Sequence, residues 1–220
     1  PVVSIEQLDA LLDAMRRHPK TPLLLGFHRR HAPYAKWLRR DMKWRGACSP
    51  CDMHAIVHEV RLPPHHWYRW GHVGGRLISN GCHWIDQFFW LNDVCPHRRF
   101  EVTQSASGTL SVHIELTNGA TFTMALSDRG SARLGTREVT EFRRGPRTAR
   151  IIDHTYVAES TRGVLRRASI EEAEVYRAMY ATFAEEILAG TALGEDPESL
   201  ERVWRPLLKA AQGLSGVQRG

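Results

Sequence analysis

A two-residue alternation of apolar and polar side chains between positions 110 and 126 restricts the possible folds of this chain more than any other pattern in it. Its first half carries Leu110, Val112, Ile114 and Leu116, and its second half carries Phe122, Met124 and Leu126. The pair Asn118-Gly119 separates the halves. Successive side chains of a β-strand point to opposite faces, and Asn-Gly favours a tight hairpin turn. The chain is therefore expected to contain an antiparallel meander with one apolar face.

Further strands are expected on both sides of this hairpin, bounded by turns rich in glycine and proline. They are predicted around Phe100 and Val102, near 136–142 and near 148–157. The outward faces carry Thr, Ser and Arg, so the second face of the sheet is expected to be either solvated or covered by a partner.

Two earlier segments also have strand patterns. His54–Leu62 alternates, which predicts a strand with Ile56, Val60 and Leu62 on one face. Leu23–Phe27 is a short unbroken apolar run, which is typical of a strand buried on both faces of a parallel sheet.

Apolar residues at helical spacing predict the helices. These are expected at 4–17, at 33–43, at 76–91, after Ser169 and after Asp196. Ser4 with Gln7, and Ser169 with Glu172, have the spacing of a capping box. The helix after Ser169 is expected to turn inward a stripe formed by Tyr176, Met179, Tyr180, Phe183 and Ile187.

Charge and composition narrow the class of protein. The net charge is +6, but the 30 Lys and Arg residues are scattered, whereas nucleic-acid proteins usually gather them on one element. There is no signal-peptide pattern and no apolar run of about 18 residues, which favours a soluble cytoplasmic protein without membrane or nucleic-acid partners. The first residue is Pro1, which suggests a fragment or a processed product.

The segment from Gly74 to Asp86 is the best candidate for chemistry. Two glycines precede an apolar helix, so its first backbone N–H groups can face a polar ligand. Ser79, Asn80 and His83 are spaced to share one helix face, and Asp86 is placed to orient the imidazole. His83 is thus a candidate general acid or base, and the alternative is a histidine satisfied within the core.

Three motifs resemble the glucose–fructose oxidoreductase / inositol dehydrogenase / MocA family. Gly74 to Asp86 has that family's pattern Gly-Gly-x-x-x-x-x-Gly-x-His-x-Ile-Asp. Leu25 to Pro33 is similar to its Gly-Phe-Asn-Arg-Arg-Phe-x-Pro segment. Pro1 to Leu8 is similar to the family segment that begins at the proline of a Glu-Lys-Pro motif. The motifs occur in the family's order, and the resemblance covers nearly the whole chain.

The resemblance implies an α+β fold with an open, mostly antiparallel sheet and helices packed on one face, similar to the C-terminal domain of dihydrodipicolinate reductase. It implies that residues 1–29 are the last helix and strand of a missing nucleotide-binding (Rossmann) domain. Residues 30–213 would form the substrate-binding and oligomerisation domain, and 214–220 a tail. The sheet face is expected to make a homo-oligomer.

The resemblance also implies an activity. The complete protein would use NAD or NADP to oxidise or reduce a sugar, cyclitol or related polyol. This chain has no Gly-x-Gly-x-x-Gly fingerprint, so no cofactor is expected to bind to it alone, and the missing domain would act in cis or in trans. His83 matches the family's catalytic histidine. The residues expected to bind substrate are Arg30, His66, Trp67, Arg76, Ser79 and Asn80.

Two departures leave a second interpretation open. Ser79 occupies the position where the family often has aspartate, and the catalytic lysine would lie just before Pro1. A non-catalytic assembly or binding protein derived from this domain is therefore the alternative. A third possibility is a zinc site at Cys48, Cys51 and His54, although one Cys-x-x-Cys pair is a weak signal and no metal is expected.

Overall fold

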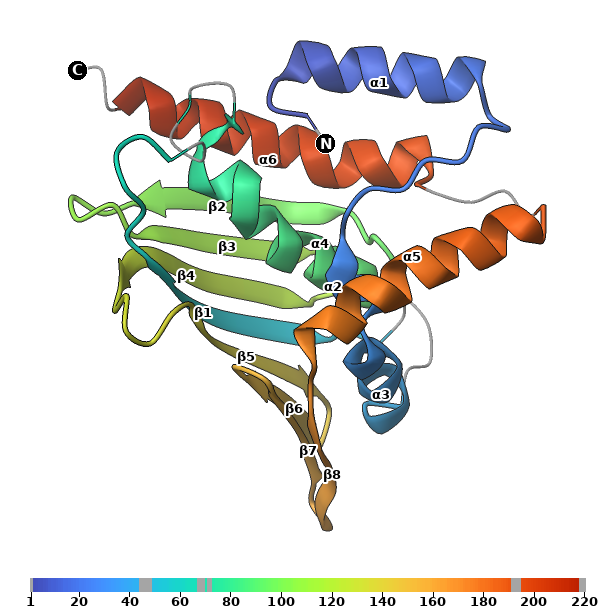
Figure 1. Ribbon diagram of the computed structural model, residues 1–220, viewed down its shortest axis with the longest axis vertical. Coiled ribbons are helices and arrows are strands. Elements are labelled where there is room, and N and C mark those ends of the chain that lie inside the picture. The colour runs from blue at the N-terminus through green and yellow to red at the C-terminus, as the bar shows by residue number, and fades with distance from the viewer. Residues whose placement is uncertain (1, 44–48, 67–69, 71–72, 191–194, 218–220) are drawn as a thin grey trace.

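A computed structural model describes residues 2–43, 49–66, 70, 73–190 and 195–217. One sheet runs through the molecule, and helices cover one of its faces (Figure 1). Its strands are β1 (Asp52–Val60), β2 (His97–Gln104), β3 (Leu110–Leu116), β4 (Thr121–Gly130), β5 (Arg137–Arg144), β6 (Arg147–Ile152), β7 (Thr155–Ser160) and β8 (Gly163–Ser169). The helices are α1 (Ile5–Arg17), α2 (His28–His31), α3 (Pro33–Asp41), α4 (Cys82–Leu91), α5 (Glu172–Leu188) and α6 (Pro197–Val217).

The order of strands in the sheet is β2-β3-β4-β1-β5-β6-β7-β8. β1 lies in the middle, parallel to β4 and antiparallel to β5, and the other neighbours pair antiparallel. The expected fold class, an open and mostly antiparallel sheet with helices on one face, is confirmed. Because β1 precedes α4 in the chain but lies beside β5, the topology brings distant residues together at the sheet centre.

The hairpin predicted at Asn118-Gly119 is confirmed. Gly119 has φ 87°, a value that glycine adopts without steric cost, and β3 pairs antiparallel with β4 around it. The alternating apolar residues Leu110 to Leu126 all face the buried side. Helix α1 begins as predicted, because the Ser4 hydroxyl accepts a hydrogen bond from the Gln7 amide at 3.2 Å.

The face assigned to β1 was wrong. Met53, Ala55 and Val57 are buried, whereas Ile56 is 50% exposed. Alternation fixes only that two sets of residues oppose each other, and a shift by one residue exchanges them. The odd-numbered set faces the helices, and this directs Glu59 to the side on which the helices lie.

The segment Leu23–Phe27 is not a strand of the sheet. Leu25 and Phe27 are buried, and the Leu23 carbonyl accepts a hydrogen bond from the Glu195 amide at 3.3 Å. Phe27 lies against Trp204 of α6, with ring centroids 6.0 Å apart. The apolar run therefore reflects burial between helices rather than strand pairing.

The last strands also differ from expectation. The stretch near 148–157 contains two strands, β6 and β7, because Asp153 turns the chain with φ 51°. β8 was not predicted, and it ends at Ser169, so this serine does not cap α5. Glu171 is the N-cap residue of α5 and makes no side-chain capping bond.

The inner face of α5 is narrower than predicted. Val175 and Met179 are buried, but Tyr176, Tyr180 and Ile187 are 42%, 62% and 48% exposed. Apolar spacing identified the helix, but it did not show how much of the stripe the fold covers.

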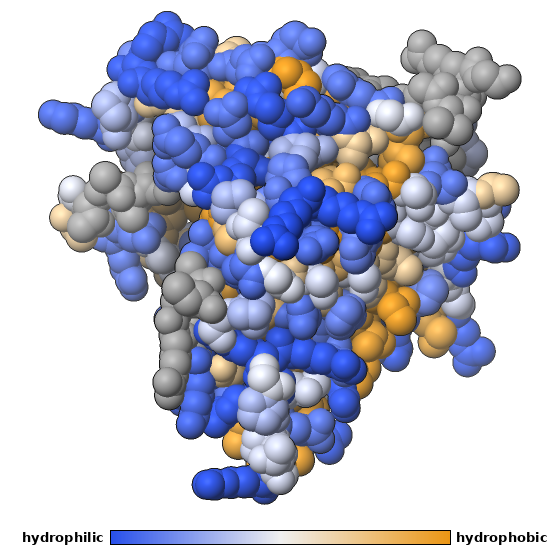
Figure 2. All heavy atoms as spheres, turned by 180° about the vertical axis from the view of Figure 1, so that it is seen from behind, coloured by the Kyte–Doolittle hydropathy of each residue, from blue (hydrophilic) through white to orange (hydrophobic). Residues whose placement is uncertain are grey.

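The expected domain boundaries fall inside helices, at 29/30 in α2 and at 213/214 in α6. Helix α1 lies along α6 (Figure 1), and Leu8 and Leu12 belong to the same hydrophobic core as the sheet. That residues 1–29 complete a nucleotide-binding domain remains a prediction. Among the described residues, no helix is both long and apolar enough to cross a bilayer. Seen from behind, the surface is mainly hydrophilic, with separate hydrophobic patches (Figure 2).

Candidate active site

The helix that carries the His83 motif contains a π-helical turn, Leu77–Gly81, directly before α4. Such turns are rare and often occur at functional sites, because one extra residue rotates the side chains beyond it. Gly74 begins the segment with φ 76°, and a Cβ there would lie 2.9 Å from the Cβ of Ile78. The close approach to Ile78 explains why this segment starts with glycine, and Asn80 and His83 line the same cavity.

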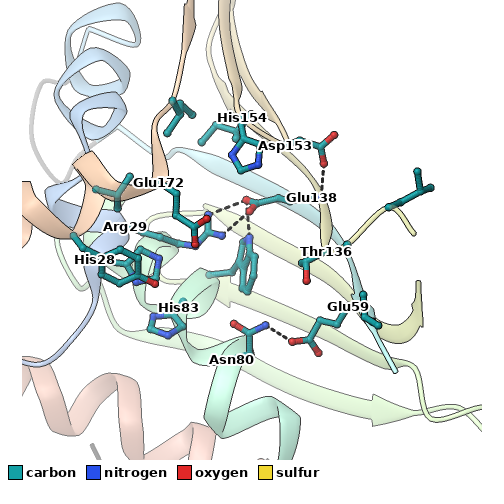
Figure 3. A pocket seen from close by; sticks show the side chains of 18 of the residues that line it. His28, Arg29, Glu59, Asn80, His83, Thr136, Glu138, Asp153, His154 and Glu172 are labelled. Atoms are coloured by element: carbon teal, nitrogen blue, oxygen red, sulfur yellow. Dashed lines mark hydrogen bonds and ion pairs between the residues drawn. The ribbon is translucent and has the colours of Figure 1, made fainter. Parts of the chain in front are cut away.

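A cavity of about 690 Å³ lies between this helix, the sheet and α5 (Figure 3). Residues from β1, β5, α2, α4, α5 and the β6–β7 turn contribute to it. Its polar lining consists of His28, Arg29, Tyr34, Glu59, His66, Asn80, His83, Thr136, Glu138, Asp153, His154, Glu172 and Tyr176. The concentration of titratable groups in one concave site is typical of a catalytic or binding pocket.

His83 borders this cavity while being packed on its other sides. Its ring lies 4.7 Å from the His28 ring and 5.9 Å from the Phe27 ring, measured between centroids. Its Nδ1 is buried and has no hydrogen-bond partner among the described residues, which leaves Nε2 for the cavity. Burial, with His28 and Arg29 nearby, lowers the pKa of His83 to about 3. The imidazole is therefore neutral at physiological pH.

His28 forms the next layer of the same ring stack. Its ring lies 4.9 Å from that of Tyr176, so three rings extend from α4 through α2 to α5. Burial and the charge of Arg29 lower the pKa of His28 to about 4. This second imidazole is also neutral, so neither of the stacked histidines brings positive charge to the cavity.

A buried ion pair forms one wall. Arg29 donates to both carboxylate oxygens of Glu138, at 2.8 and 2.6 Å, and its guanidinium stacks on Trp84 at 4.0 Å. Trp84 and Thr140 also donate to Glu138. Burial alone would raise the pKa of Glu138, but the Arg29 charge and these hydrogen bonds outweigh it and lower the pKa. Because Arg29, Trp84 and Thr140 all donate to it, the Glu138 carboxylate holds the cavity wall together rather than binding a ligand.

The opposite wall holds a second carboxylate. Glu59 pairs with Arg76 at 2.9 Å and accepts a hydrogen bond from the Asn80 amide (Figure 3). Arg76 also pairs with Asp128 at 2.6 Å. Burial raises the pKa of Glu59, although Asn80 and Arg76 oppose the shift. One cation thus serves two carboxylates, and the cluster retains about one negative charge.

Gly130 sets the position of Glu59 from the neighbouring strand. A Cβ on Gly130 would lie 2.7 Å from the Glu59 carbonyl oxygen, which is too close for any side chain. We expect Gly130→Ala to lower the free energy of unfolding by about 1–3 kcal/mol through this overlap. Gly26→Ala is the matched control, because no atom lies within 4 Å of its Cβ position, and it should change stability by less than about 1 kcal/mol. Urea unfolding of both variants tests this, and equal stabilities would contradict it.

The structure distributes the predicted site residues unevenly. His83, Asn80 and His66 line the cavity, whereas Arg30, Arg76 and Ser79 are not among its lining residues. Trp67 lies outside the described residues.

Arg30 has structural partners instead of an open approach to the cavity. It pairs with Asp86, which is 1% exposed, and with Glu195 at 2.9 Å. The expectation that Asp86 orients His83 was wrong, because both carboxylate oxygens of Asp86 accept hydrogen bonds from Arg30. Burial raises the pKa of Asp86 to about 6 although the Arg30 charge opposes this shift.

The described residues do not form a cradle for a dinucleotide. The strand–glycine turn–helix unit that holds a pyrophosphate requires consecutive parallel strands, and the single parallel pair here, β1 with β4, is not joined in that way. Gly74 packs on Ile78, and Arg76 is occupied by carboxylates.

Metal ligands are not assembled in the described part of the chain. No three His, Cys, Asp or Glu side chains there lie close enough to share an ion. Cys51 is buried, which raises the pKa of its thiol to about 12, and Cys48 lies outside the described residues. The zinc alternative gains no support from these observations.

Several lining residues were not predicted. His28 and Arg29 lie within the Leu25–Pro33 motif, from which only Arg30 was predicted as a site residue. The motif could therefore have indicated these two residues as well. Glu138 and Glu172 carried no signal, because only the position of β5 next to β1 and the packing of α5 bring them to the cavity.

No family model matches this chain, and no curated protein matches it by sequence. Solved structures do. A dehydrogenase from Chromobacterium violaceum has a TM-score of 0.78 at 13% identity, covering 98% of this chain and 68% of the other. UDP-N-acetylglucosamine 3-dehydrogenase GnnA from Acidithiobacillus ferrooxidans has a TM-score of 0.74 at 14% identity, covering 97% and 68%. The dehydrogenase MviM from Clostridium difficile has a TM-score of 0.70 at 14% identity, covering 96% and 68%.

This chain has the fold of these dehydrogenases. The similarity extends over nearly all of this chain, and it covers about two thirds of the length of each dehydrogenase. The fold implied by the three sequence motifs is thereby confirmed. At these identities the likeness concerns the fold alone.

Proposed function

We propose that this chain is the substrate-binding part of an NAD(P)-dependent oxidoreductase that acts on a sugar, cyclitol or related polyol. The observation that carries the proposal is His83, whose Nε2 is left for a 690 Å³ cavity while its Nδ1 is buried. Hydroxyl groups need donors and acceptors in pairs, and the cavity is lined by Asn80, His66, Glu59 and Glu172. The name of one protein with this fold, UDP-N-acetylglucosamine 3-dehydrogenase GnnA, agrees with a reaction on a sugar ring.

In the proposed reaction, this chain binds the polyol and handles a proton. Oxidation of an alcohol removes a hydride from carbon and a proton from oxygen. The neutral Nε2 of His83 can accept the hydroxyl proton and pass it on to solvent, because a pKa of about 3 makes the imidazolium release it readily. In the reverse direction, Nε2 takes a proton from solvent and donates it to the carbonyl oxygen. NAD(P), bound by a nucleotide-binding domain outside this chain, would take up or supply the hydride.

The test uses the complete protein with a panel of sugars and cyclitols and either cofactor. We expect turnover of at least one polyol, seen as a change in NAD(P)H absorbance. We also expect no NAD(P)H binding to residues 1–220 alone, measured by fluorescence titration. Polyol binding without turnover would favour the non-catalytic alternative, to which Ser79 in place of aspartate points. Tight NAD(P)H binding by residues 1–220 would contradict the division of roles.

We also propose that the open face of the sheet joins two copies of the chain. Ile56, Val139 and Ile152 are 50%, 42% and 45% exposed, and the strand register places them side by side on β1, β5 and β6. Neighbouring exposed apolar residues at a sheet centre are costly unless they are covered.

Ile56→Lys is expected to convert such a dimer into a monomer, because it would bury a charge in the contact. Sedimentation velocity measures the change. Leu134→Lys is the control, since Leu134 is 61% exposed but lies outside the sheet. A wild-type chain that remains monomeric at high concentration would refute the proposal.

A further inference from the structure

The charges around the cavity constrain the substrate further, given the proposed function. Its charged lining residues are one arginine and four acids, namely Arg29, Glu59, Glu138, Asp153 and Glu172. Arg29 neutralises Glu138, and Arg137 neutralises Asp153 at 2.5 Å. Glu59 belongs to the cluster in which one arginine serves two carboxylates. The cavity therefore carries an excess of negative charge, and its one lining arginine is already paired.

Of the four acids that line the cavity, Glu172 is the one that can bind a charged group of the substrate. It lies in the first turn of α5, at the positive end of the helix dipole. It lines the cavity and points into it (Figure 3), and the ion pairs of Arg29, Arg76 and Arg137 are made with other carboxylates. A carboxylate at the wall of a substrate cavity attracts a cation and repels an anion.

Tyr176 is four positions after Glu172, so both lie on the same face of α5 and both line the cavity. The residue is 42% exposed, and its ring packs against that of His28 with centroids 4.9 Å apart. A fixed aromatic face beside a carboxylate is a combination that binds alkylammonium groups, because the face of the ring is electron-rich. The neutral His28 and His83 do not compete for Glu172.

From this arrangement we infer that the substrate is an amino polyol, a sugar or cyclitol in which an ammonium group replaces one hydroxyl. The ammonium binds between Glu172 and Tyr176. The remaining hydroxyls extend across the cavity toward His83, Asn80 and Glu59. Phosphorylated and carboxylated polyols are disfavoured, because no unpaired cation among the described lining residues can receive them.

The complete protein tests this with three matched probes: glucose, glucosamine and glucose 6-phosphate, together with the corresponding inositol, inosamine and inositol phosphate. We expect kcat/KM for the amino compound to exceed that for the neutral one by about tenfold, and the phosphate to be the poorest. Glu172→Gln should abolish the preference for the amine. Tyr176→Leu should reduce it and Tyr176→Phe should retain it. Glu101→Gln, which removes an exposed carboxylate on β2, is the control and should leave the preference unchanged.

The outcomes separate this inference from the proposed function. Preference for the phosphate, or an amine preference that survives Glu172→Gln, overturns the inference while the oxidoreductase proposal stands. Absence of turnover for all probes overturns the proposed function. In that case calorimetric titration with glucosamine and glucose decides the inference: tighter binding of the amine, lost in Glu172→Gln, supports it, and equal binding refutes it.

Discussion

Replacing His83 by alanine is expected to lower the turnover of the complete protein by about 100- to 10,000-fold, the usual contribution of a positioned general acid or base. The reason is that Nε2 of His83 is the imidazole nitrogen left for the cavity, since Nδ1 is buried. Steady-state kinetics on a polyol substrate measure the loss. His18→Ala, at the exposed end of α1, is the control and should retain wild-type turnover.

His83→Gln distinguishes the role of the nitrogen. The glutamine amide can place an N–H donor near the position of Nε2 but is not a base. Activity retained in His83→Gln but lost in His83→Ala would identify a hydrogen-bond donor, and loss in both would identify a proton acceptor. Unfolding of both variants together with a cavity that binds no polyol would instead support a core histidine without a catalytic role.

Replacing Arg30 by methionine is expected to lower the free energy of unfolding by about 3–5 kcal/mol at pH 8, because it leaves a buried carboxylate unpaired. Asp86 is 1% exposed, and Arg30 occupies both of its oxygens. Urea unfolding measures the loss. Arg16→Met is the matched control, since Arg16 pairs with Glu201 at an exposed site, and it should cost less than about 1 kcal/mol.

The cost of Arg30→Met should depend on pH. Burial already raises the pKa of Asp86 to about 6, and loss of the Arg30 charge raises it further. The folded variant then binds a proton that the unfolded chain, with an aspartate pKa of about 3.9, does not hold. Its stability therefore falls as the pH rises above about 4, and the deficit is smaller at pH 5 than at pH 8. A stable Arg30→Met variant with weakened polyol binding would show instead that Arg30 contacts substrate.

The sequence patterns predicted the position of His83 but not the ion pair between Arg30 and Asp86. The motif around His83 identified the residue that borders the cavity, because a histidine in an apolar helix after two glycines is unusual. The same spacing argument failed for Asp86, since a residue three positions away on a helix can turn to a partner on another element. Here Arg30 from α2 is that partner.

Local structure followed from the sequence wherever one side of the chain is apolar. The β3–β4 hairpin, the cap of α1 and the long helices result from periodicity and turn chemistry, which act between residues near in sequence. The tertiary structure alone decided which face of β1 is buried, that Leu23–Phe27 packs between helices, and that Glu138 and Glu172 meet His83 across one cavity. The physical reason is that these outcomes depend on strand order and helix packing, and contacts between distant segments leave no periodic trace in either segment.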